Sequence, residues 1–117
     1  MSELTSMEVL YEKMGEFTKM ETEIPFGEFQ DYYQSLMAYL MAKYQEMSKD
    51  DLLKAKGICM IVAGNAKMRS LRKDENRKKY SKMAEKARFW EDAIRLNLVK
   101  SGMTEAEIDQ AVGGFWA

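Results

Sequence analysis

The sequence contains no histidine, one cysteine and one proline in 117 residues. Without histidine the chain has no imidazole to act as a general base or to activate a serine or cysteine nucleophile. The same absence removes most zinc sites and di-iron sites of the Glu-x-x-His type. The single thiol, Cys59, excludes a disulfide within the chain. We therefore expect a protein that is not an enzyme and that holds no metal or cofactor.

Glycine-rich phosphate loops are also missing, because neither G-x-G-x-x-G nor G-K-S occurs. Gly57 and Gly64 instead lie two helical turns apart in a largely apolar segment. The longest nearly apolar run, residues 58–66, is too short to span a bilayer. The N-terminus carries Glu3 and Glu8 but no basic segment, unlike a secretory signal. The expectation is a cytoplasmic protein without a membrane partner.

Composition and the scarcity of helix breakers indicate the fold class. Hydrophobic residues make up 46% of the chain and charged residues 32%, which is typical of a globular protein. A chain of this length buries roughly two-thirds of its unfolded surface, enough to fold without disulfides. Apolar residues recur at helical spacing almost throughout. We predict a single all-α domain, residues 1–117, with four main helices and a short C-terminal fifth.

The predicted helices cover residues 4–17, 28–47, 49–72, 77–100 and 104–113. The third contains β-branched residues at its middle, which also suit a strand. No other segment offers a strand to pair with, so we predict a helix at the centre of the bundle. Gly57 and Gly64 would let another helix approach it closely.

The helix boundaries have recognisable signals. Ser48 precedes the third helix, and Thr104 with Glu107 forms a capping-box pattern before the fifth. Thr5 or Ser2 could cap the first helix. The predicted helix 28–47 has a wide apolar face that includes Tyr32, Met37, Tyr39 and Met41, and we expect it to be buried on two sides. In the predicted helix 77–100, Phe89, Ala93 and Leu96 lie on a second side, away from the main apolar stripe.

Charge is distributed unevenly. Residues 1–51 hold eleven acidic and four basic side chains, whereas residues 52–100 hold fourteen basic and five acidic ones. The densest basic segment is 67–88, and a turn is predicted near Asp74–Asn76. It could bind a polyanion, form a solvated hairpin tip or face the acidic half of the chain. The candidate polyanion-binding residues are Lys67, Arg69, Arg72, Lys73, Arg77, Lys78, Lys79 and Lys82.

Sulfur and aromatic side chains offer further candidates. Cys59 has apolar neighbours and no base beside it, which indicates an inert buried thiol. Eleven methionines suit an irregular helical core first, a partner groove second and a soft-metal site third. Phe115 and Trp116, after Gly113 and Gly114, would either pack back onto the bundle or bind a partner.

The sequence thus favours a non-catalytic interaction or regulatory protein, which self-associates as a homodimer or binds a protein partner. The alternative is a small nucleic-acid-associated protein that uses residues 67–88. Salt-sensitive binding of nucleic acid would distinguish the alternative from the first hypothesis.

Overall fold

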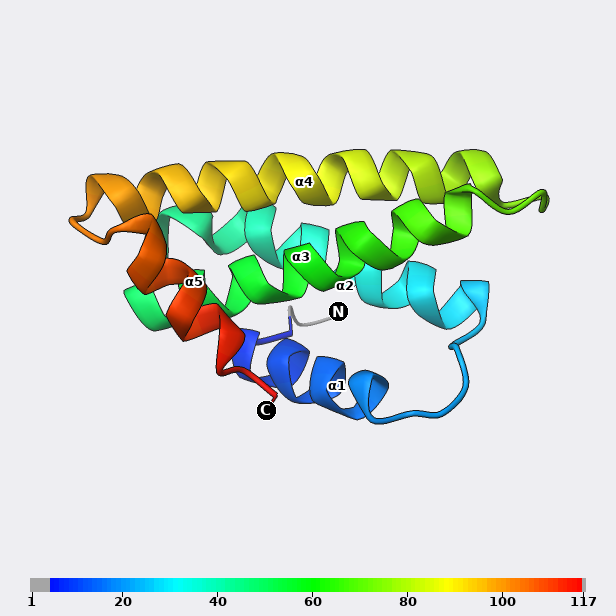
Figure 1. The fold of residues 1–117 in the computed structure, drawn as a ribbon, viewed down its shortest axis with the longest axis horizontal. Helices are drawn as coiled ribbons and strands as arrows, with labels where there is room; N and C mark the ends of the chain where they lie inside the picture. The colour runs from blue at the N-terminus through cyan, green and yellow to red at the C-terminus, as the bar shows by residue number, and fades with distance from the viewer. Residues whose placement is uncertain (1–4, 117) are drawn as a thin grey trace.

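The computed structural model describes residues 5–116, which fold into α-helices packed along one another (Figure 1). The helices are α1 (Met7–Thr18), α2 (Phe26–Lys43), α3 (Lys49–Ser70), α4 (Arg77–Lys100) and α5 (Glu105–Gly113), with a 3-10 turn, η1 (Tyr44–Glu46), after α2. No strand occurs between residues 5 and 116. The prediction of an all-α fold with four main helices and a short fifth is confirmed, and so is the helical prediction for the β-branched segment.

Short polar side chains begin three of the helices. Ser48 Oγ accepts a hydrogen bond from a backbone N–H in the first turn of α3, as predicted. Thr104 and Glu107 form the complete capping box at α5. The prediction for α1 was wrong, because Ser6 rather than Thr5 is the cap, accepting from Val9 N at 3.2 Å. The other candidate, Ser2, lies outside the described residues.

α3 lies at the centre of the bundle, as predicted. It packs extensively against α4 and also contacts α1 and α5. Figure 1 shows α4 running along α3 for much of its length. Small buried residues such as Ala55, Cys59 and Ala66 line α3, so neighbouring backbones can come close to it. This helix is buried on several sides and therefore carries no single apolar stripe.

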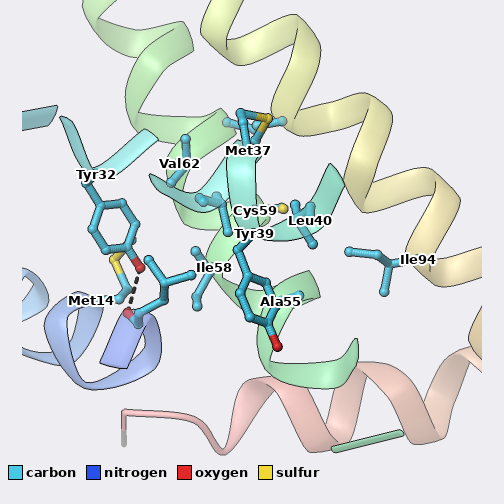
Figure 2. Close-up of a cluster of buried hydrophobic side chains, with 14 of the residues drawn as sticks. Met14, Tyr32, Met37, Tyr39, Leu40, Ala55, Ile58, Cys59, Val62 and Ile94 are labelled. Atoms are coloured by element: carbon cyan, nitrogen blue, oxygen red, sulfur yellow. Dashed lines mark hydrogen bonds between the residues drawn. The ribbon is translucent and has the colours of Figure 1, made fainter. Parts of the chain in front are cut away.

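The core joins side chains from all of the main helices (Figure 2). Tyr32 of α2 is buried, and its hydroxyl donates to the carbonyl oxygen of Leu10 at 2.6 Å, which ties α2 to α1. Met37 and Tyr39 are buried as predicted. Met41 is not, since 74% of its surface is exposed, and the second apolar side of α2 ends before it.

The two glycines of α3 do not receive a neighbouring helix. A Cβ at Gly57 would lie 3.3 Å from atoms of Phe115 and Trp116, so this glycine makes room for the C-terminal aromatic rings. A Cβ at Gly64 would meet nothing within 4 Å, and Gly64 is exposed. The predicted helix–helix approach was therefore wrong at both positions: one glycine faces the tail and the other faces solvent.

Candidate interaction surfaces

The end of α3, the start of α4 and the turn between them form a basic hairpin tip. Figure 1 shows this turn projecting at one end of the bundle. The turn lies where the sequence predicts it, with Asp74 Oδ1 accepting from Asn76 N at 2.6 Å. Seven of the eight candidate polyanion residues are exposed here. They are Lys67, Arg72, Lys73, Arg77, Lys78, Lys79 and Lys82.

Arg69 does not belong to this exposed set, because its side chain is only 5% exposed. Its Nη1 donates to the carbonyl oxygen of Ile24 at 3.0 Å and to the Tyr80 hydroxyl at 3.2 Å. Its guanidinium also lies 4.6 Å from the centre of the Phe29 ring. These contacts hold the α1–α2 connection against α3 and α4, so Arg69 is not placed to reach a polyanion at the surface.

Glu23 connects the acidic half of the chain to the hairpin tip. Its carboxylate accepts two hydrogen bonds from Arg72, at 2.6 and 2.7 Å, and lies 3.8 Å from Arg69 Nε. The hydrogen bond from Arg72 holds the pKa of Glu23 below its ordinary value. Two of the basic candidates therefore face the acidic half of the chain, as one interpretation of the charge pattern predicts.

The C-terminal aromatic residues pack back onto α1 and α3. Trp116 Nε1 donates to the carbonyl oxygen of Tyr11 at 2.9 Å, and the two rings stack with centroids 4.8 Å apart. Phe115 meets the Tyr11 ring edge-on at 5.3 Å. Both aromatic residues are half-buried. The structure thus shows the first of the two predicted arrangements, in which these rings cover the bundle.

The outer face of α4 exposes a row of apolar side chains. Phe89 is 60% exposed, Leu96 51% and Val99 40%. Phe89 and Leu96 lie on a second side of α4, as predicted, and this side is exposed. At 100° per residue they lie about 160° from the core stripe that contains Ile94 and Leu98, and no element within residues 5–116 covers that side. The helical periodicity of residues 77–100 already separates the two stripes, but it does not show which of them is covered.

Charged residues flank this apolar row on the same side of α4. Glu85 lies four residues before Phe89, and Lys100 lies four residues after Leu96. On the wheel all four positions fall within about 60° of one another. Both charged residues are exposed, and neither forms an ion pair with another described residue. We refer to Glu85, Phe89, Leu96 and Lys100 as the α4 outer row.

Cys59 lies in the core between α3 and its neighbours (Figure 2). Burial raises the pKa of its thiol to about 12, and the charge of Glu91 adds to the rise. A thiol in this environment stays protonated and is a poor nucleophile. Within residues 5–116, no three His, Cys, Asp or Glu side chains gather as ligands for a metal ion.

Comparisons with other proteins give no relative, since no protein-family model, no curated protein and no solved structure matches this chain. In the part of the chain that the structure describes, no helix combines the length and apolarity needed to cross a membrane. Because no relative indicates a function, we infer one from the two exposed surfaces described above, the basic hairpin tip and the α4 outer row.

Proposed function

We propose that the chain is a non-catalytic interaction protein that forms a homodimer through the α4 outer row, and that it acts in the cytoplasm. The observation that carries the proposal is the exposure of Phe89 and Leu96 on the outer face of α4, opposite the side that packs into the core. Large apolar side chains grouped on one exposed face are typical of interaction sites. Aromatic residues often supply much of the binding energy at such sites.

The spacing of the α4 outer row is self-complementary. Two copies of α4 can pack antiparallel about a two-fold axis that passes between Asp92 and Ala93. Each residue before the axis in the sequence then faces the residue of the other copy that lies equally far after it. Phe89 of each copy then lies opposite Leu96 of the other, and Glu85 lies opposite Lys100. A two-fold interface needs this reciprocity, because each residue's contact is repeated with the roles exchanged.

The size of this face indicates a weak dimer. Covering a half-exposed Phe or Leu contributes about 1–2 kcal/mol, and a dimer covers two of each. Association costs at least about 4 kcal/mol in lost translational and rotational freedom. The charge pairs at the rim add specificity more than affinity. The difference between the apolar contribution and this cost is at most about 4 kcal/mol, which corresponds to a dissociation constant of about 1 mM or higher.

Sedimentation equilibrium on the full chain tests the proposal. Glu85→Lys and Lys100→Glu should each weaken the dimer, because each places like charges opposite each other. The double variant should restore it, since the pair is then exchanged. Asp31→Lys, an exposed reversal on α2, is the matched control and should change nothing.

Two outcomes would contradict the homodimer. One is a chain that stays monomeric even at several millimolar, including the case in which a different protein binds the α4 outer row. The other is a dimer whose affinity does not respond to the charge reversals, which would place the interface elsewhere.

The second candidate function is binding of nucleic acid through the basic hairpin tip. Among the described residues, six of its exposed bases form no ion pair with an acidic side chain: Lys67, Lys73, Arg77, Lys78, Lys79 and Lys82. Such side chains are available to phosphate groups. Binding through them would be insensitive to base sequence and would weaken steeply as salt concentration rises.

Fluorescence anisotropy with a labelled DNA or RNA oligonucleotide tests this candidate. Lys73→Glu with Lys78→Glu should reduce binding at low salt. It should also make the slope of log binding constant against log salt concentration shallower by about two. Lys19→Glu with Lys43→Glu changes the net charge equally at exposed sites outside residues 67–88 and should have a much smaller effect. Equal loss in both double variants would show a general charge effect rather than a site.

A further inference from the structure

Two large apolar side chains lie exposed within the basic hairpin tip. Leu71, at the C-terminal end of α3, is 76% exposed, and Met68 is 53% exposed. Of the large apolar side chains that the structure describes, Leu71 is the most exposed. Its backbone is helical, so at 100° per residue Lys67, Met68 and Leu71 fall within about 100° of one another. The tip therefore presents an apolar pair beside a lysine at the end of the bundle that projects in Figure 1.

The exposed bases of the tip outnumber its acids. Asp74 and Glu75 lie in the turn, and Arg72 is paired with Glu23. Six exposed bases form no ion pair with another described residue: Lys67, Lys73, Arg77, Lys78, Lys79 and Lys82. Six bases against two acids leave the tip with a net positive charge, which attracts anionic partners.

The bases at the start of α4 point in different directions. Arg77, Lys78 and Lys79 are consecutive, so they span about 200° around the helix axis. A nucleic-acid duplex lies against one side of a helix and reaches only the bases on that side. The headgroup layer of a membrane surrounds a tip that enters it and reaches bases on every side. Acyl chains would also cover Leu71 and Met68, which contacts with nucleic-acid phosphates leave in water.

We propose that the basic hairpin tip binds the surface of an anionic lipid membrane, with its bases among the headgroups and with Leu71 and Met68 at the boundary of the acyl chains. Binding at such an interface combines burial of apolar area with attraction to anionic lipids. It needs no spanning segment, whereas the expectation of no membrane partner rests on the absence of a spanning segment and of a secretory signal. The tip shares no residue with the α4 outer row, so this inference does not depend on the homodimer.

Co-sedimentation of the full chain with lipid vesicles tests the proposal. One set of vesicles contains phosphatidylcholine alone, and the other contains phosphatidylserine and phosphatidylcholine in equal amounts. Each base near an anionic surface strengthens binding about five-fold. We therefore expect the chain to bind the phosphatidylserine vesicles at least about a hundred-fold more tightly than the neutral ones, and to be released as salt concentration rises.

A pair of matched variants tests the apolar contact. Leu71→Gln should weaken binding to the phosphatidylserine vesicles about ten-fold, because it removes the apolar side chain that enters the membrane. Met41→Gln changes a side chain on α2 that is 74% exposed, close to the exposure of Leu71, and should leave binding unchanged. Leu71→Gln should not alter the affinity for a DNA oligonucleotide, which separates membrane binding from the second candidate function.

Charge reversal tests the contribution of the bases. Lys73→Glu with Lys78→Glu should weaken vesicle binding at least about twenty-fold, five-fold for each base removed. Lys19→Glu with Lys43→Glu is the control of equal net charge and should have a much smaller effect.

Four outcomes would overturn the proposal. The chain would bind both kinds of vesicle equally, or Leu71→Gln and Met41→Gln would change vesicle binding to the same extent. Leu71→Gln would weaken oligonucleotide binding as much as vesicle binding. Alternatively, the oligonucleotide would bind under conditions in which the phosphatidylserine vesicles do not, and the tip would then be a nucleic-acid site.

Discussion

The guanidinium of Arg69 lies in a position that is almost fully removed from water, and its contacts compensate for that burial. Two oxygen acceptors, from Ile24 and Tyr80, take hydrogen bonds from Nη1. The Phe29 and Tyr80 rings lie 4.6 and 5.5 Å from the guanidinium and offer their negative faces to it. Arg72, three residues later, is exposed and pairs with Glu23 in water. The two arginines are neighbours in sequence but differ in what their removal would cost.

Arg69→Met should lower the free energy of unfolding by about 2–4 kcal/mol, because it leaves the buried carbonyl of Ile24 and the hydroxyl of Tyr80 without their donor. Arg72→Met should have little effect, since exposed ion pairs contribute little to stability. Urea unfolding followed by circular dichroism measures both. Similar losses in the two variants would contradict the structural role assigned to Arg69.

The lowered pKa of Glu107 affects how the free energy of unfolding responds to acid. The backbone N–H and the hydroxyl of Thr104 donate to its carboxylate, at 2.9 and 3.1 Å, and these bonds hold the pKa of Glu107 below its ordinary value of 4.5. The folded chain therefore binds fewer protons than the unfolded chain just below pH 4.5. The stability that Glu107 contributes is present above this pH and is lost as the pH falls through the folded pKa.

Glu107→Gln should consequently flatten the fall in unfolding free energy below pH 4.5. Asp109→Asn, an exposed change on the same helix, is the matched control and should leave the slope closer to that of the wild type. Urea unfolding at a series of pH values gives the slopes. A Gln variant with an unchanged slope would mean that the capping carboxylate does not couple to folding.

At the scale of the elements, α3 and α4 show two ways in which a helix can be buried. α4 has one packed side and one exposed side, so its apolar residues form a stripe. α3 has neighbours around much of its circumference, so its buried residues include small, large and even charged side chains. The periodicity of residues 77–100 was therefore more informative about orientation than that of residues 49–70.

The two glycines of α3 provide a matched pair of substitutions. Gly64→Ala should raise the free energy of unfolding by about 0.5–1 kcal/mol, because it removes a flexible residue from an exposed helix interior. Gly57→Ala should not gain this stability, since its Cβ would press on the rings of Phe115 and Trp116 at 3.3 Å. Urea unfolding and tryptophan fluorescence test this. Equal stabilisation by both substitutions would show that the tail does not depend on Gly57.

At the scale of the whole molecule, the C-terminal tail closes the bundle against α1. The hydrogen bond from Trp116 to Tyr11 joins residues 105 positions apart in the sequence. Trp116 adopts a left-handed backbone conformation with φ of 59°, which is unfavourable for a bulky residue. The stacking and the hydrogen bond offset that strain. The tail therefore contributes to folding as a long-range contact rather than as a local one.

Deletion of residues 115–117 should lower the free energy of unfolding by about 2 kcal/mol, because two half-buried aromatic side chains are lost. Trp116→Phe keeps an aromatic ring without the indole donor and should have an intermediate effect. Urea unfolding gives both values. A deletion that leaves stability unchanged would contradict the role of the tail.

Helix identity followed closely from the sequence, whereas the candidate surfaces did not. Ser48, Thr104 and the turn at Asp74 act within a few residues of their own position, so the local sequence already specifies their hydrogen bonds. Arg69 and Lys67 look alike in the basic segment, yet one is buried and the other exposed. That difference depends on which side of α3 faces Tyr80 and the α1–α2 connection.

The sequence by itself determined that this chain forms helices, where most of them begin and end, and that imidazole chemistry is not available to it. Only the tertiary structure decided that Arg69 lies in the core, that Phe89 and Leu96 face outward, and that Trp116 packs against Tyr11. The physical reason is the separation, along the sequence, of the residues that each kind of contact joins. Backbone hydrogen bonds and caps form between residues a few positions apart, whereas burial depends on which helices pack together, and those contacts join residues far apart in the chain.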